Sequence, residues 1–327
     1  MQLTTAELCT LAQGAVHTAV CGRFVTWHRF TEKQLAYYRK TSDFFYTRAL
    51  ASAGIRIECR TDATALSFDF RVKQASARDR YSFDLFVDGV MTDHYAMEGV
   101  SAEEGHVFFP LPEGTHRVTL YLPSLFGTEL AHFTLTDATM IAPVTKSRRM
   151  LLLGDSITQG IDCSYTSQTY ANLIADMLDA SAVNQGVAGA PFDPAAIDSE
   201  IGFSPDIVTV AYGTNDYTKS PERETMIKNA NAFYRRVREA FPDAALFGLL
   251  PIWRADANAK PRPVGSFEEA KEIVRAAAEA VGATVLDGDG FVPHLPACFG
   301  DGHLHPNDFG FKFYADALFG AMRPYLI

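Results

Sequence analysis

From residue 150 onward the sequence alternates short apolar runs with stretches of helical periodicity, and this alternation constrains the fold more than any other feature. The first run, Met150–Leu153, is bounded by glycine, as is typical of a buried strand. Five such strand and helix units predict a parallel sheet covered by helices on both faces. We therefore expect an α/β domain with a three-layer, flavodoxin-like architecture. Its strands are expected at 150–153, 182–184, 207–212, 244–250 and 284–286.

The helices between these strands are marked by their caps and apolar stripes. Ser167 is expected to cap a helix whose apolar residues recur three and four positions apart. A second helix is expected over 222–241, with Ile227 on its inner face. Ser266 with Glu269 three residues later forms a capping box for the next helix, and a last helix should begin near Asn307 or Asp308.

Residues 55–140 have a different pattern, with short β-branched or aromatic segments separated by turns and no helical period between them, whereas residues 4–20 could form a helix or a loop. Asp88-Gly89 is a strong hairpin signal. This pattern predicts an all-β sandwich, jelly-roll-like, as an accessory domain over residues 1–146, before a catalytic domain over 147–327. The basic run 146–149 is interpreted as a solvated linker. Strands are expected at 55–59, 66–72, 81–87, 106–109, 117–122 and 132–136.

Composition and charge narrow the possible partners. The 327 residues are 47% hydrophobic and carry a formal net charge of −10, which argues against nucleic acid and anionic membranes as partners. The five cysteines show no zinc-ligand spacing, and the histidines of the first half are scattered, so we expect no metal and no cofactor. The N-terminus lacks the pattern of a signal peptide, which predicts a cytoplasmic protein. The oligomeric state is left open.

The loops that follow the predicted strands carry the polar groups that acyl transfer requires. Because the carboxyl ends of parallel strands meet at one edge, Ser156, Gly189, Asn215 and the 301–307 loop should lie together. Ser156 is a nucleophile if His305 takes its proton, and Asp301 can hold the imidazole. The Gly189 N–H and the Asn215 amide can stabilise an oxyanion. His303 is the alternative base, but Pro306 and Asn307 fix His305 just before a helix.

Four blocks on these loops resemble those of the SGNH (GDSL) hydrolase superfamily. They are Gly-Asp-Ser-Ile-Thr at 154–158, the glycine-containing block at 184–189, Gly-Thr-Asn-Asp at 213–216 and His-Pro-Asn at 305–307. The resemblance implies a serine esterase in which Ser156 is the nucleophile and His305 the base. It also implies that the N–H groups of Ser156 and Gly189 and the amide of Asn215 hold the oxyanion.

One position departs from the family pattern. The family commonly places its aspartate three residues before the histidine, where this sequence has Gly302, and Asp301 lies four residues before His305. Two arrangements are therefore open. Either the loop accommodates one extra residue and Asp301 completes a Ser-His-Asp triad, or a backbone carbonyl orients His305 and the enzyme uses a Ser-His dyad.

The order of a β-sandwich followed by an SGNH domain is similar to that of two-domain carbohydrate esterases that remove acetyl groups. It implies a short-chain, acetyl-type ester substrate on a carbohydrate, and no extended apolar lid follows the serine. Trp253, after the fourth strand, is expected to wall the acyl pocket or stack on a sugar. The alternatives are a lysophospholipase, thioesterase or acyltransferase on the same site, or a carbohydrate-binding protein with a vestigial hydrolase domain.

Overall fold

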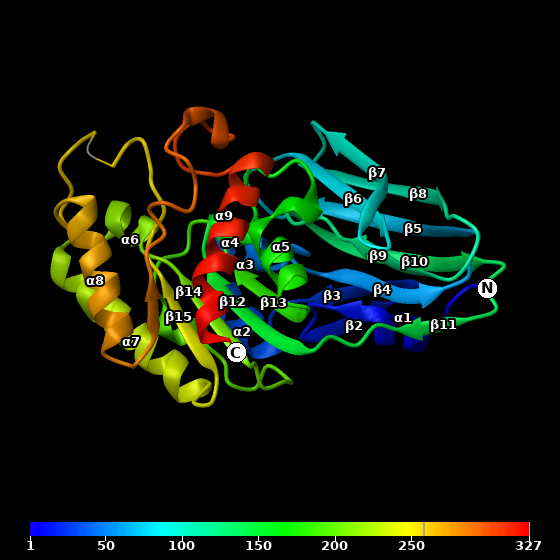
Figure 1. Ribbon diagram of the computed structural model, residues 1–327, viewed down its shortest axis with the longest axis horizontal. Coiled ribbons are helices and arrows are strands. Elements are labelled where there is room, and N and C mark those ends of the chain that lie inside the picture. Colours follow the sequence, from blue (N-terminus) through cyan, green and yellow to red (C-terminus); the bar gives the residue numbers. More distant parts are fainter. Residues whose placement is uncertain (258, 327) are drawn as a thin grey trace.

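The structure is a computed structural model and describes residues 1–257 and 259–326. Its strands form two antiparallel sheets and one parallel sheet. The antiparallel sheets and the N-terminus lie at one end of an elongated molecule, and the parallel sheet with its helices lies at the other (Figure 1). Within the described residues, no helix combines the length and the apolar character needed to cross a membrane.

The two antiparallel sheets pack face to face, which confirms the predicted β-sandwich. One has the order β1-β4-β9-β6-β7 with β11 beside β4, and the other has the order β2-β3-β10-β5-β8. Their inner faces share one core, in which the Phe68 ring of β5 lies 5.2 Å from the Phe83 ring of β6. The jelly-roll assignment stays a prediction. The strands are β1 (Ala12–Gln13), β2 (His17–Cys21), β3 (Phe24–His28), β4 (Arg56–Thr61), β5 (Ala65–Gln74), β6 (Arg80–Val87), β7 (Val90–Glu98), β8 (Ala102–Pro110), β9 (His116–Tyr121), β10 (Phe126–Thr136) and β11 (Ile141–Pro143).

The parallel sheet has the order β13-β12-β14-β15-β16, so the predicted flavodoxin-like architecture is confirmed. Its strands are β12 (Arg148–Gly154), β13 (Ala180–Gly186), β14 (Ile207–Ala211), β15 (Ala245–Leu249) and β16 (Thr284–Leu286). Its helices are α4 (Ser156–Gln159), α5 (Tyr170–Met177), α6 (Thr214–Lys219), α7 (Arg223–Ala240), α8 (Phe267–Glu279) and α9 (Asp308–Met322).

Alternate side chains of β12 enter two different helical layers. Met150 and Leu152 are buried among residues of α5 and α9. Leu151 and Leu153 are buried among residues of α7 and α8 on the opposite face. A strand covered on both faces has to be apolar at every position, and this explains the unbroken run in the sequence.

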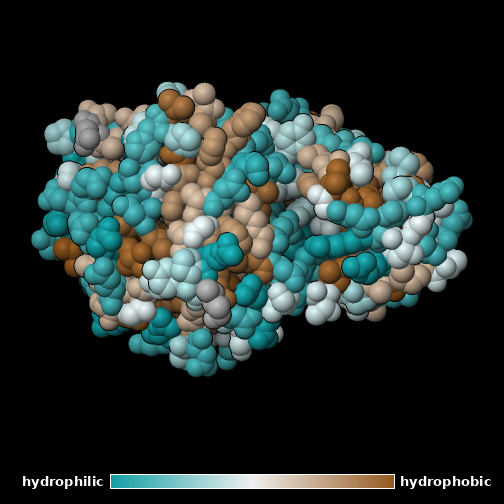
Figure 2. All heavy atoms as spheres, in the orientation of Figure 1, coloured by the Kyte–Doolittle hydropathy of each residue, from teal (hydrophilic) through white to brown (hydrophobic). Residues whose placement is uncertain are grey.

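Helix α9 also has an outward face that stays apolar. Phe309 and Phe313 are among its exposed side chains. Figure 2 shows a band of hydrophobic residues over α9 on a face that is otherwise largely hydrophilic.

Three short helices precede the sandwich strands or lie between them: α1 (Thr5–Leu11), α2 (Glu32–Thr41) and α3 (Asp43–Ala49). The sequence did not predict α2 and α3, which carry the aromatic cluster of residues 37–46. Tyr38 is buried in the same core as α7 and α8, and the Tyr37 hydroxyl donates to Asp193 at 2.7 Å. Residues of the first half therefore complete the core of the α/β half.

Three local predictions are wrong. Thr169, not Ser167, caps α5, because Ser167 lies in a short 3-10 helix just before it. Ile227 is exposed, and its neighbour Met226, also on α7, is buried in the core instead. Lys146 is not solvated: only 2% of its side chain is exposed, and its Nζ lies 3.3 Å from Glu58 of β4.

Arg29 joins the two halves through its guanidinium, which is fully buried. It donates to the carbonyls of Ala51 (2.8 Å) and Arg48 (2.8 Å) on its own side. Across the junction it donates to Asn184 (2.7 Å) and Gly186 (2.6 Å) at the end of β13. Burial lowers the pKa of Arg29 to about 9, so the group stays charged at neutral pH.

We expect Arg29→Met to lower the free energy of unfolding by about 3 kcal/mol, because four buried carbonyls lose a charged donor. Urea unfolding at pH 7 measures the change. Arg39→Met, at an exposed site on α2, is the control and should stay within about 0.5 kcal/mol of the wild type. Equal stability of the two variants would contradict a joining role for Arg29.

Candidate active site

The serine lies at the carboxyl end of β12, where the strand passes directly into α4. Asp155 is the N-cap of α4 and accepts a hydrogen bond from the N–H of Ile157 at 3.0 Å. Helix α4 packs tightly against the neighbouring strand end: a Cβ on Gly186 would lie 2.5 Å from the backbone nitrogen of Gln159. Glycine at the end of β13 therefore allows the turn that holds Ser156.

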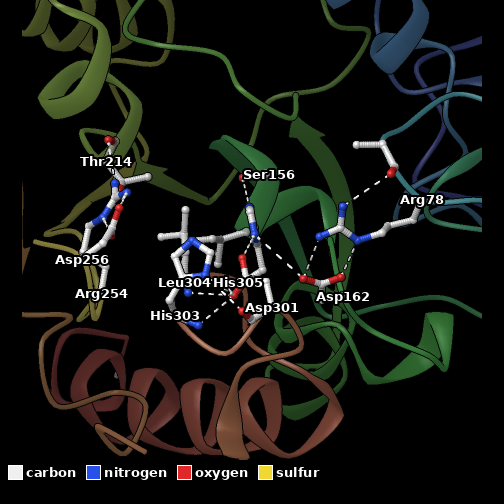
Figure 3. A network of polar contacts seen from close by, with 12 residues as sticks. Arg78, Ser156, Asp162, Thr214, Arg254, Asp256, Asp301, His303, Leu304 and His305 are labelled. Carbon is white, nitrogen blue, oxygen red and sulfur yellow. Dashed lines mark hydrogen bonds and ion pairs between the residues drawn. The ribbon is translucent and has the colours of Figure 1, made fainter. Parts of the chain in front are cut away.

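His305 lies between Ser156 and Asp301, as Figure 3 shows. Its Nε2 is 2.9 Å from Ser156 Oγ, and its Nδ1 is 2.6 Å from Asp301 Oδ2. The structure thus has the geometry of a Ser-His-Asp triad. The Ser156 side chain and the His305 ring are both mostly buried, with the ring 18% exposed.

The extra residue before the histidine is accommodated by a tight loop. Gly302 adopts a left-handed backbone (φ 76°), a conformation that glycine tolerates best. Asp301 Oδ1 accepts the N–H groups of His303 (3.0 Å), Leu304 (2.8 Å) and His305 (3.1 Å), and Oδ2 is left for the His305 ring. Of the two arrangements left open by the sequence, the structure has the first.

These contacts also decide the charge of Asp301. Burial favours its neutral form, but the hydrogen bonds from the His305 ring and from three backbone N–H groups outweigh burial and lower its pKa below the ordinary range. The carboxylate is therefore ionised at any pH at which the protein would work.

The two predicted oxyanion donors come from the loops after β13 and β14. Gly189 has a left-handed backbone (φ 83°), and a Cβ there would lie 3.2 Å from the Phe44 ring. Asn215 Nδ2 donates to Asp155 Oδ2 at 3.2 Å and to the carbonyl of Ala190 at 3.3 Å. Asp155 thus connects the turn of the serine to the side chain of Asn215.

Trp253 and His303 lie near this loop cluster but do not join the triad. The Trp253 ring stacks on His294 with centroids 5.1 Å apart, and it lies 5.2 Å from the Phe299 ring. His303 Nδ1 lies 3.0 Å from the backbone carbonyl of Asp301, with no bond to Ser156 among the described contacts. The histidine next to the serine is therefore His305.

The sequence missed one pair beside the histidine. Asp162 accepts two hydrogen bonds from Arg78, whose Nε lies 2.6 Å from Oδ1 and whose Nη2 lies 3.0 Å from Oδ2. Arg78 lies on the loop between β5 and β6, and no sequence signal connects it to residues of the other half.

Asp162 also belongs to the one group of potential metal ligands found among the described residues. Asp162, Asp301 and His305 have ligand atoms within 4.8 Å of one another. However, Arg78 binds both oxygens of Asp162, and Asp301 holds His305 Nδ1. We therefore interpret this group as an acid–base cluster with a paired arginine and assign no metal to it.

Two buried carboxyls lie behind the site. Burial raises the pKa of Asp155 to about 6 and that of Asp216 to about 7. Asp216 Oδ1 accepts the N–H of Phe192 at 3.1 Å, whereas Oδ2 has no partner among the described residues. Ionising Asp216 therefore leaves a buried charge with little compensation.

A raised pKa in the folded state means that the folded protein holds this proton more tightly than the unfolded chain does. The stability from Asp216 is complete below the ordinary aspartate range and is lost as pH rises through about 7. We expect Asp216→Asn to remove about 2 to 3 kcal/mol of the stability loss between pH 5 and pH 8. Urea unfolding at both pH values tests this, with the exposed Asp316→Asn as control. An unchanged loss in Asp216→Asn would contradict the assignment.

Comparisons with known proteins concern the same part of the chain. Residues 152–313 match the GDSL-like lipase/acylhydrolase family. A GDSL lipase of Mycobacterium tuberculosis is 26% identical over 198 residues, which cover 54% of this chain and 83% of the lipase.

Two solved structures resemble nearly the whole chain. The salicylyl-acyltransferase SsfX3 from a tetracycline biosynthetic pathway has a TM-score of 0.81 at 20% identity, covering 96% of this chain and 94% of its own. A family two carbohydrate esterase from Cellvibrio japonicus has a TM-score of 0.68 at 18% identity, covering 96% and 95%. These likenesses concern the fold. The family match shows that residues 152–313 form a domain of the GDSL/SGNH lipase and acylhydrolase family, a family of ester hydrolases.

Proposed function

We propose that the protein is a serine esterase that works through an acyl-enzyme on Ser156. The observation that carries this proposal is the line of contacts from Ser156 Oγ through the His305 ring to Asp301, at 2.9 and 2.6 Å. A serine hydroxyl is a weak nucleophile unless a base accepts its proton, and this geometry supplies the base and the group that orients it.

In the acylation step, Ser156 Oγ attacks the ester carbonyl while its proton passes to His305 Nε2. Asp301 holds the Nδ1 proton and stabilises the imidazolium that forms. Collapse of the tetrahedral intermediate expels the alcohol, which takes the proton from Nε2. A water molecule then attacks the acyl-enzyme by the same route, giving the free acid and restoring Ser156.

The oxyanion is assigned to the N–H groups of Ser156 and Gly189 and to the Asn215 amide. The Asn215 amide donates to Asp155 and to the Ala190 carbonyl at the rather long distances of 3.2 and 3.3 Å. We propose that one amide hydrogen turns to the oxyanion in the tetrahedral intermediate, while Asp155 keeps the other and fixes the amide plane.

The proposed substrate is a short-chain, acetyl-type ester on a carbohydrate. The likeness to a family two carbohydrate esterase over most of the chain supports the carbohydrate part. Trp253, which stacks on His294 and contacts Phe299, is proposed as a wall of the substrate site. Its packing on both rings would give a sugar or a small acyl group a rigid surface.

Acyl transfer to an alcohol is the second candidate, because the salicylyl-acyltransferase resembles this chain most strongly of the structures described above. The two reactions share the acyl-enzyme and differ in the group that attacks it. Added sugar acceptors would yield new esters if the protein is a transferase, whereas a hydrolase would release only free acid.

We expect Ser156→Ala to lower the rate of p-nitrophenyl acetate hydrolysis by at least about 10³-fold, because no acyl-enzyme can form. The wild type should prefer acetyl to longer acyl esters and should release acetate from acetylated oligosaccharides. Ser164→Ala, in an exposed loop, is the matched control and should keep full activity. Unchanged hydrolysis by Ser156→Ala would overturn the proposal, and a preference for long acyl chains would favour a lipid substrate.

Asn215→Ala should lower kcat by about 10² to 10³-fold and leave KM nearly unchanged, since the lost donor acts mainly on the transition state. Steady-state kinetics with p-nitrophenyl acetate measures this. Asn231→Ala, on the exposed side of α7, provides the control. A rise in KM with unchanged kcat would place Asn215 in substrate binding instead.

A further inference from the structure

Two carboxylates, not one, face the inner nitrogen of His305. Asp301 Oδ2 lies 2.6 Å from Nδ1, and Asp162 Oδ2 lies 3.9 Å from the same atom. The Asp162 side chain is only 5% exposed. A Cβ on Gly300 would lie 2.5 Å from the Asp162 Cβ, so the histidine loop approaches Asp162 as closely as a glycine allows.

Asp162 is bound from the other half of the molecule. Arg78 holds it with two hydrogen bonds of 2.6 and 3.0 Å, and Arg80 Nη2 lies 3.5 Å from its Oδ1. Arg78 lies on the loop between β5 and β6, and Arg80 is the first residue of β6, so both belong to the sandwich half. Figure 3 shows the Arg78 guanidinium paired with both oxygens of Asp162, one of which also faces His305.

The charged and titratable groups near the His305 ring come from four parts of the chain. Asp301 and His303 lie on its own loop, and Asp162 lies on the loop after α4. Asp155, beside Ser156, interacts with the ring electrostatically, and Arg78 is reached through Asp162. Two arginines offset the charge of Asp162, and Arg78 makes the closer contacts, at 2.6 and 3.0 Å against 3.5 Å for Arg80.

The consequence follows from charge and geometry. Without Arg78, an almost fully buried Asp162 would keep only the longer contact to Arg80. It would then compete with Asp301 for the Nδ1 proton and draw the ring away from Ser156. A second unpaired carboxylate would also favour the imidazolium, which cannot accept the proton of Ser156.

We propose that Arg78 is a positioning residue of the active site: by binding Asp162 it leaves Asp301 as the single partner of His305 Nδ1 and keeps the imidazole available as a base. The inference rests on the proposed function of Ser156 and His305. It gives the sandwich half an indirect part in the reaction, because Arg78 acts on His305 through Asp162.

The test compares Arg78→Ala, Asp162→Asn and the double variant. In Arg78→Ala we expect kcat/KM at pH 7 to fall about tenfold and the acid limb of its pH profile to move up by about 1 pH unit. Adding Asp162→Asn should return the limb to the wild-type position, because the competing charge is gone. Arg78→Lys should give an intermediate profile. Arg71→Ala, which removes an exposed arginine paired with Glu104, is the matched control and should match the wild type.

A second readout does not depend on turnover. NMR of isotope-labelled histidine, assigned with His305→Gln, follows protonation of the His305 ring in folded protein, and circular dichroism checks folding. The ring should titrate at higher pH in Arg78→Ala and return in the double variant, even if the natural reaction is not ester hydrolysis. A ring titration and pH profile that do not move in Arg78→Ala, or that the second substitution does not restore, would overturn the proposal. If the wild type hydrolysed none of the esters while the titration shift was present in Arg78→Ala, the proposed function would be overturned and the role of Arg78 would stand.

Discussion

The burial of β12 on both faces is the constraint on which the rest of this structure depends. Its side chains alternate between the α5/α9 layer and the α7/α8 layer, so the strand has no polar face on which to meet water. The chain can first become polar where the strand ends, at Asp155 and Ser156. Burial thus fixes where Ser156 can lie, and the neighbouring strands end beside it for the same reason.

The parts of the fold that could be predicted are those whose signals are local. The strands of the parallel sheet are continuous apolar runs, and the Ser266 capping box marks α8 within a few residues. Helices α2 and α3 were missed because their stability comes from packing against distant residues: Tyr38, for example, is buried beside the α7/α8 layer. Ile227 and Lys146 show the same limit, since neighbours far along the chain decide which side chains are covered.

The candidate site divides in the same way. Ser156, Asn215 and His305 could be placed together because each follows a predicted strand or precedes a predicted helix. The spacing of Asp301 left its geometry open, and it was decided by the left-handed backbone of Gly302, which a sequence does not display. Arg78 could not be predicted at all. It lies 84 residues from Asp162, in a loop whose sequence resembles any polar turn.

The buried guanidinium of Arg29 has a consequence for how such a protein can be divided. Its four acceptors lie on both sides of the predicted boundary at residue 147, and two of them terminate the strand next to the serine. Phe44, whose ring lies beside Gly189, and Arg78, which binds Asp162 next to His305, also precede that boundary. We therefore expect that residues 147–327 could not be exchanged between proteins as an independent unit. The sandwich half is better regarded as part of the scaffold that any transplanted or shuffled variant would have to carry along.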